Sequence, residues 1–182
     1  MLNYKCDNVV GGIMIYYIDQ KVFSIKDSIK ITDENDNPQF FVKGKLHSFE
    51  IGKKLTILDA NGTEIAKIKQ KLFKIFPEYH IFENENLLYK VKKRIKFFGI
   101  KTIVKDKDNN QVLLIKTKKN IFSMSFYQLN DNKEVARINK KFKIVKDKYT
   151  LEILDNSVFA NKYFIMFTIA IDAIYHSNKS RD

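Results

Sequence analysis

The hydrophobic and polar positions of this chain alternate with a period of two over most of its length, and the alternation recurs as an internal repeat. At the heart of the repeat is a five-residue motif: a β-branched apolar residue, a polar residue, a polar residue or glycine, a basic residue, and usually another apolar residue. Successive copies lie about 24 residues apart, within the range of known structural repeats. The copies are residues 18–22, 42–46, 68–72 and 91–95, with weaker copies at 115–119 and 138–142.

Clusters of Asp, Asn and Gly separate the copies in matching phase and predict tight turns. These residues tolerate the left-handed backbone conformation that tight hairpins demand. Asn61–Gly62 fits the sequence preference of a type I′ turn most clearly. The turn segments are residues 33–37, 59–62, 83–86, 107–110 and 130–133.

Each repeat therefore predicts one long and one short β-strand, because β-branched and aromatic residues dominate and apolar residues recur at every second position. Six hairpins give about twelve strands, and an even number of antiparallel strands can close into a barrel without exposed edges. A propeller would need a repeat of about 40 residues or more, and solenoid coils seldom carry such regular hairpin turns. The long strands are predicted at 13–23, 39–49, 63–75, 87–98, 111–123 and 134–145, and the short ones at 28–32, 54–58, 79–83, 101–105, 125–129 and 149–154.

Residues 157–175 break the alternation and predict a helix that is apolar on every side. Such a helix is buried in protein or in lipid. Its length is marginal for crossing a bilayer, and Asp172 lies within it. A barrel of about twelve strands is too wide for its own side chains to fill. We therefore expect the helix to occupy the interior of the barrel.

Five segments of the chain, in turns, strand centres and the helix, carry a resemblance to a known family. They are residues 19–25, 31–35, 42–45, 68–73 and 171–174. With them, a barrel threaded by a hydrophobic C-terminal helix resembles the Tubby C-terminal-like fold, and the sequence is similar to the LURP-one-related family, including its small bacterial members. The resemblance covers nearly the whole chain from about Ile13 and implies a scaffold without an agreed enzymatic activity. Related Tubby domains bind phosphoinositide head groups through basic side chains, but no Tubby lipid-binding motif is matched here.

The length of 182 residues and the apolar content of 45% fit one domain, residues 13–182, preceded by an N-terminal extension at 1–12. The single cysteine, Cys6, excludes an internal disulfide. The lack of a convincing targeting segment predicts a cytoplasmic protein, and we expect a monomer. No metalloprotease helix motif, Gly-rich phosphate loop or nucleophile elbow occurs, so we assign no catalytic residue, metal or cofactor and expect a protein that is not an enzyme.

The net charge of +12 favours binding to an anionic partner such as a membrane surface or nucleic acid. Strand alternation turns the basic residues of the repeat outward. We expect them to form a Lys-rich wall that binds anionic phospholipid or phosphoinositide head groups, with a peripheral position at the inner membrane surface. A solvated surface that reflects a bias toward Lys is the plain alternative. The candidate head-group residues are Lys90, Lys92, Arg94, Lys96, Lys69 and Lys71.

Two other partner classes are weighed against lipid. A structural or protein-interaction domain without a small ligand needs only the scaffold and its loops, and the aromatic-rich segment 73–79 is a candidate protein contact. Nucleic acid is the poorer candidate, because only three of the basic residues are arginines and no recognition motif is present.

Buried polar residues are expected where the helix meets the repeat. The middle residue of each motif faces inward by alternation, and Asp172 on the helix needs a partner if it is buried. We expect Asp172 to meet Lys93 or Lys140, or to hydrogen-bond to Gln20 or Gln70; alternatively it lies in the last exposed turn near His176. The inward-facing motif centres are Gln20, Gly44, Gln70, Lys93, Thr117 and Lys140.

Overall fold

Twelve antiparallel strands close into one barrel in the computed structural model, which describes residues 12–19, 29–46, 52–96, 99–117, 123–141 and 148–176. Each strand pairs with its neighbours in chain order, and β1 pairs with β12 to complete the ring. The barrel predicted from the repeat is confirmed. The strands are β1 (Met14–Asp19), β2 (Ile29–Thr32), β3 (Pro38–Leu46), β4 (Lys53–Asp59), β5 (Glu64–Lys71), β6 (Glu78–Glu83), β7 (Asn86–Lys96), β8 (Gly99–Asp106), β9 (Gln111–Thr117), β10 (Ser123–Gln128), β11 (Glu134–Lys141) and β12 (Lys148–Ile153).

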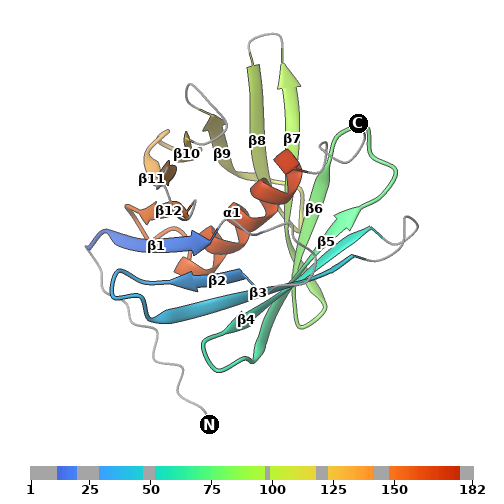
Figure 1. Ribbon diagram of the computed structural model, residues 1–182. Coiled ribbons are helices and arrows are strands. Elements are labelled where there is room, and N and C mark those ends of the chain that lie inside the picture. Colours follow the sequence, from blue (N-terminus) through green and yellow to red (C-terminus); the bar gives the residue numbers. More distant parts are fainter. Residues whose placement is uncertain are drawn as a thin grey trace.

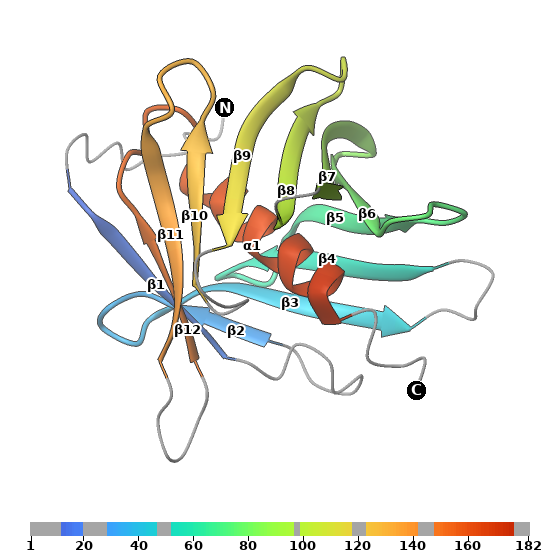
Figure 2. The ribbon, with the colours of Figure 1, turned by 90° about the horizontal axis from the view of Figure 1, so that it is seen from above.

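A single helix in the described part of the chain, α1 (Asn161–His176), lies along the interior of the barrel, as Figures 1 and 2 show from two directions. The helix starts later than the predicted Ser157, because Asp155 accepts hydrogen bonds from the backbone N–H and the hydroxyl of Ser157 and holds that residue in a turn. No helix in the described residues has the length and apolar character needed to cross a membrane.

The helix fills the barrel with large apolar side chains. Phe164 and Phe167 are fully buried, and the Tyr89 ring of β7 packs edge-on against Phe167 with ring centroids 5.2 Å apart. Burial of one such side chain stabilises the fold by about 1.5–3 kcal/mol. The helix therefore supplies much of the core that the strands alone would lack. The buried helix residues are Phe164, Ile165, Met166, Phe167, Thr168, Ile169, Ala170, Ile171, Ala173 and Ile174.

Side chains of the strands alternate between this core and the outer surface as the period-two pattern predicts. On β7, Val91 is fully buried in the core, whereas Lys90 and Lys92 on either side of it face outward. The same alternation turns Lys43 of β3 away from the helix, and its side chain is exposed.

Two of the polar turns are capped in the same way by an aspartate at their first position, which fits their equivalent places in the repeat. The carboxylate of Asp33 accepts hydrogen bonds from the backbone N–H groups of Asn35 and Asn37, and Asp59 accepts them in the same way from Asn61 and Thr63. Asp and Asn side chains favour such local bonds to the backbone.

The type I′ prediction for Asn61–Gly62 is wrong. Only Gly62 has a positive φ there, at 83°, and its N–H donates to the carbonyl of Asp59, so the turn begins at Asp59 and ends on Gly62. Two consecutive positive φ values, the requirement of a type I′ turn, occur instead at Asn84 and Glu85, with 47° and 60°.

The two mouths of the barrel differ, because antiparallel strands place alternate connections at opposite ends. The polar mouth carries the turns from each even-numbered strand to the next odd-numbered one, and α1 begins there, where Lys162 forms an ion pair with Glu83 at 2.8 Å. The opposite end, here called the helix-end mouth, receives the last turn of α1. At this mouth two motif centres reach Tyr175: the hydroxyl of Thr117 lies 3.3 Å from the Tyr175 hydroxyl, and Lys93 Nζ lies 5.4 Å from its ring centroid.

Candidate functional site

The outer face of strands β7, β8 and β9 carries six basic side chains, which we call the basic wall. They come into line because the antiparallel register places like charges directly across from one another. Lys90 of β7 lies opposite Lys105 of β8. Arg94 lies opposite Lys101, and Lys101 lies in turn opposite Lys116 of β9. The basic wall consists of Lys90, Lys92, Arg94, Lys101, Lys105 and Lys116.

No carboxylate among the described residues forms an ion pair with any member of the basic wall. Lys90 Nζ donates instead to the carbonyl of Lys107 at 3.1 Å and to Asn109 Oδ1 at 2.7 Å, which are neutral acceptors. Lys116 Nζ donates to Asn132 Oδ1 at 3.3 Å and lies 4.2 Å from the ring centroid of Tyr127. The ammonium groups of Lys90 and Lys116 therefore contact neutral groups.

Lys92 lies at the centre of the wall. Partial burial lowers its pKa, the positive charges of Lys105, Arg94 and Lys74 lower it further, and only Glu78 opposes them. Neighbouring positive charges therefore repel one another around Lys92.

An apolar residue lies beneath these lysines on the same outer face. Ile103 of β8 lies opposite Lys92 on one side and Leu114 on the other, and it is only 2% exposed although it does not belong to the interior core. Long lysine stems cover apolar surface while their ammonium groups stay in solvent. The wall is thus a packed layer with its charges on the outside.

The six residues predicted as the head-group site do not all join the wall. Lys90, Lys92 and Arg94 lie in it, and the side chain of Lys96 lies outside the described residues. Lys71 is exposed at the end of β5. Lys69 is separate, because its ammonium group forms an ion pair with Glu85 at 3.1 Å and lies 4.6 Å from the ring centroid of Phe82.

Sequence reasoning missed Lys101 and Lys105. Both lie in the strand predicted at 101–105, and they alternate there with Ile103 as outward-facing residues should. Pairing the predicted short strand with the long one before it would have brought them opposite Arg94 and Lys90. The missing information was the register between the two strands.

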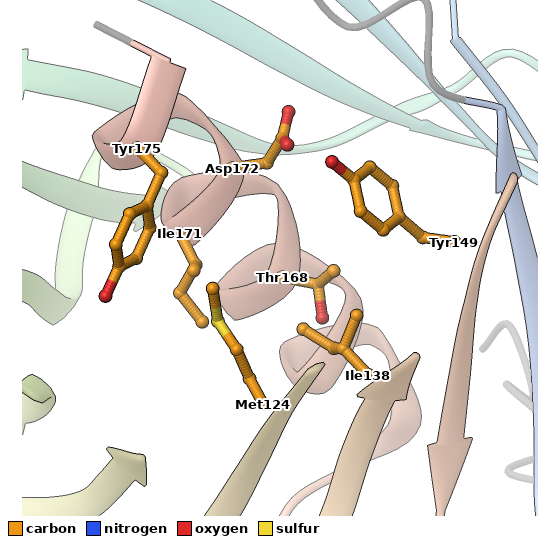
Figure 3. Close-up of a pocket in the computed structure, with 7 residues that line it drawn as sticks. All are labelled: Met124, Ile138, Tyr149, Thr168, Ile171, Asp172 and Tyr175. Atoms are coloured by element: carbon orange, nitrogen blue, oxygen red, sulfur yellow. The ribbon is translucent and has the colours of Figure 1, made fainter. Parts of the chain in front are cut away.

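A small cavity lies at the helix-end mouth between α1 and strands β10, β11 and β12. Its volume is about 30 Å³, enough for one or two water molecules and too small for a larger ligand. Figure 3 shows Asp172 on one side of it, with the hydroxyl end of the Tyr149 ring pointing toward the Asp172 carboxylate. The lining residues are Met124, Ile138, Tyr149, Thr168, Ile171, Asp172 and Tyr175.

The partners predicted for Asp172 stay a prediction, but the structure places two of the candidates. Asp172 is half-buried, and Lys93 Nζ lies 5.4 Å from the centroid of the Tyr175 ring. The amide oxygen of Gln70 accepts a hydrogen bond from the backbone N–H of Lys53 at 3.2 Å. Gln20 and the side chains of Lys140 and His176 lie outside the described residues. A pair between Asp172 and Lys140 stays a prediction.

The described residues contain no group of three or more His, Cys, Asp or Glu side chains placed to hold a metal ion. The basic wall is the candidate site that the described residues offer.

Comparison with known proteins agrees with this architecture. The pattern of the LURP-one-related family matches residues 14–172, which is most of the chain. The chain belongs to the LURP-one-related family. The chain is also similar to the uncharacterized protein YxjI of Bacillus subtilis (strain 168), with 31% identity over 88 residues. The match spans 48% of this chain and only 53% of YxjI.

The fold is also that of a solved structure. The crystal structure of a protein from Arabidopsis thaliana superposes with a TM-score of 0.61, covering 89% of this chain and 90% of the plant protein at 21% sequence identity. At that identity the likeness shows the fold alone.

Proposed function

We propose that this protein is a non-enzymatic domain that binds the surface of an anionic phospholipid membrane through the basic wall. The observation that carries the proposal is the row of like-charge pairs, Lys90–Lys105, Arg94–Lys101 and Lys101–Lys116, with no ion-paired carboxylate among the described residues. Like charges directly opposite each other destabilise a sheet. Each of the three pairs lowers the stability of the sheet, and an anionic partner would neutralise the charges that repel one another.

A membrane surface suits this wall better than a single small anion. The charges are spread over three strands of the outer surface, and no described pocket encloses them. Lysine is a compact point charge that does not need the bidentate geometry through which arginine recognises one phosphate. Each basic residue near an anionic surface contributes about 1 kcal/mol, and the attraction falls off within about a Debye length. The proposal places the protein at the cytoplasmic face of the membrane.

Co-sedimentation with vesicles tests the proposal. The protein is expected to sediment at low salt with vesicles of equal parts phosphatidylcholine and phosphatidylserine, and to bind them more weakly as salt is added. It should not sediment with vesicles of phosphatidylcholine alone. The variant Lys92→Glu/Arg94→Glu should lose most of this binding.

A matched control comes from the other side of the barrel. Lys30 and Lys43 are exposed on β2 and β3, four or more strands away from β7 in the ring, so Lys30→Glu/Lys43→Glu changes the net charge equally. This control should retain most of the binding. Equal loss in both variants would show that net charge alone acts, and absence of binding to the anionic vesicles at low salt would refute the proposal.

A further inference from the structure

The connection between β5 and β6, residues 72–77, departs from every other described hairpin turn in its composition. The turns of the polar mouth carry Asp and Asn, whereas this loop presents large apolar side chains to solvent. Phe73 is 102% exposed, Ile75 is 94% exposed and Phe76 is 41% exposed. In Figures 1 and 2 the green connection between β5 and β6 stands out from the barrel.

The loop is anchored at both ends, so its apolar tip is a fixed feature of the fold. At the start, Leu72 turns back against β4, where its Cδ2 atom lies 3.0 Å from the place that a Cβ on Gly52 would occupy. At the end, the carbonyl of Pro77 accepts a hydrogen bond from the backbone N–H of Lys93 at 3.4 Å. Between these anchors Phe73 has a positive φ of 58°, which is uncommon for an aromatic residue.

Basic residues surround the apolar tip. Lys71 precedes it, Lys74 lies between Phe73 and Ile75, and the charge of Lys74 reaches Lys92 in the basic wall closely enough to lower the pKa of Lys92. The loop lies at the helix-end mouth, and so do the ends of β7 and β8 that carry Arg94 and Lys101. The apolar tip and the nearest part of the wall therefore occupy neighbouring positions at the same end of the barrel.

We infer that the β5–β6 loop inserts Phe73 and Ile75 into the apolar layer of an anionic bilayer while the basic wall rests on the phosphate head groups. Aromatic and aliphatic side chains with lysines beside them suit the membrane interface, where the apolar part sinks below the head groups and the ammonium groups stay among them. The flanking positive charge selects an anionic lipid surface over an uncharged apolar partner. This inference rests on the proposed function and adds the element that orients the barrel.

The absence of tryptophan from the sequence makes the inference directly measurable. Phe73→Trp places a single fluorophore at the tip of the loop, and Leu129→Trp places one at a 38% exposed site in the β10–β11 turn of the polar mouth. With vesicles of equal parts phosphatidylcholine and phosphatidylserine, emission from the Phe73→Trp variant should shift to the blue and be quenched by phosphatidylcholine brominated on its acyl chains. Emission from the Leu129→Trp control should not change.

The loop also contributes affinity that salt does not remove. Phe73→Ser/Ile75→Ser keeps every charge and should bind anionic vesicles about tenfold more weakly at high salt, because burial of apolar surface is lost. Unchanged binding of this variant would overturn the inference.

The outcomes separate the two proposals. Vesicle binding with neither a blue shift nor quenching overturns the insertion and leaves the basic wall as the membrane contact. No binding to anionic vesicles at low salt overturns both.

Discussion

Arg94 on β7 lies directly opposite Lys101 on β8, and Lys101 faces Lys116 on β9 in the same way. Lys101 is therefore the middle of three adjacent cations on the outer wall. Cross-strand pairs are the units that stabilise a sheet, and each like-charge pair acts against it. The repulsion among these three cations lowers the stability of the sheet, and under the proposed function an anionic membrane surface would neutralise them.

Reversing the middle charge should separate stability from binding. Lys101→Glu turns two repulsive pairs into attractive ones, each worth about 0.2–1 kcal/mol, so the free energy of unfolding should rise at low salt. Vesicle binding should fall in the same variant. Urea unfolding and co-sedimentation measure the two effects, and a less stable protein or unaltered binding would contradict the account of the basic wall.

The twelve strands could be predicted because the same alternation of apolar and polar residues occurs in six copies along the chain. Alternation gave the inward and outward faces, and Asp and Asn marked the turns at the polar mouth, where Asp33 and Asp59 fulfil the same capping role. The helix followed from its apolar surface on all sides. These features are local in sequence, and closure of the ring then satisfies the remaining strand edges.

The site could be predicted only in part, because it depends on relations between distant residues. Alternation showed that Lys69 faces outward, but not that Glu85 lies beside it in space, 16 residues further along the chain. The strand predicted at 63–75 assigned part of the apolar tip to β-structure. In the structure β5 ends at Lys71, and Phe73 adopts a positive φ two residues later. A signal was present: a period-two strand should not continue through apolar residues on both faces at 72–76.

Two phenylalanines in opposite environments test the placement of the helix. Phe167 is fully buried against Tyr89, so Phe167→Ala should cost about 3–5 kcal/mol in unfolding free energy. Phe73→Ala removes the same atoms from a side chain that is 102% exposed, and it should change stability by less than about 0.5 kcal/mol. Thermal melts of both variants decide the matter, and similar losses would show that α1 does not form the core.

Acid should weaken the fold through two carboxylates. Hydrogen bonds from Lys67 and Lys69 lower the pKa of Glu85 to about 2, and those from Lys133 and Ser157 lower the pKa of Asp155 to about 2. Because both folded-state values lie below the unfolded ones, each group adds stability above the unfolded pKa and loses it as pH falls toward about 2. Glu85→Gln and Asp155→Asn should each reduce the decrease in unfolding free energy as the pH falls below about 4. The same decrease in both variants as in the unaltered protein would contradict the ion pairs.

The same two variants make a matched test of where vesicles bind. Each raises the net charge by one, but the two act at different places. Glu85→Gln removes the ion pair of Lys69 on β5 and leaves Lys67 paired with Glu64 alone, whereas Asp155→Asn removes the ion pair of Lys133 in the β10–β11 turn. We expect Glu85→Gln to raise affinity for anionic vesicles about threefold to tenfold, in keeping with about 1 kcal/mol for each basic residue near the surface. Asp155→Asn should leave affinity unchanged, and equal gains would show that binding follows total charge.

The partner of Asp172 is the remaining prediction from the sequence. Ile138 of β11 lines the cavity beside Asp172, and Lys140 follows two residues later on the same strand, toward the same mouth. The register places Lys140 opposite Tyr149, which also lines the cavity. We therefore expect Asp172→Asn and Lys140→Met to be coupled in a double-mutant cycle by about 0.5–3 kcal/mol.

Lys93→Met is the control, because Lys93 Nζ lies over the Tyr175 ring. Its cycle with Asp172→Asn should show a coupling under about 0.5 kcal/mol. Urea unfolding of the variants gives both energies, and coupling to Lys93 without coupling to Lys140 would reverse the assignment.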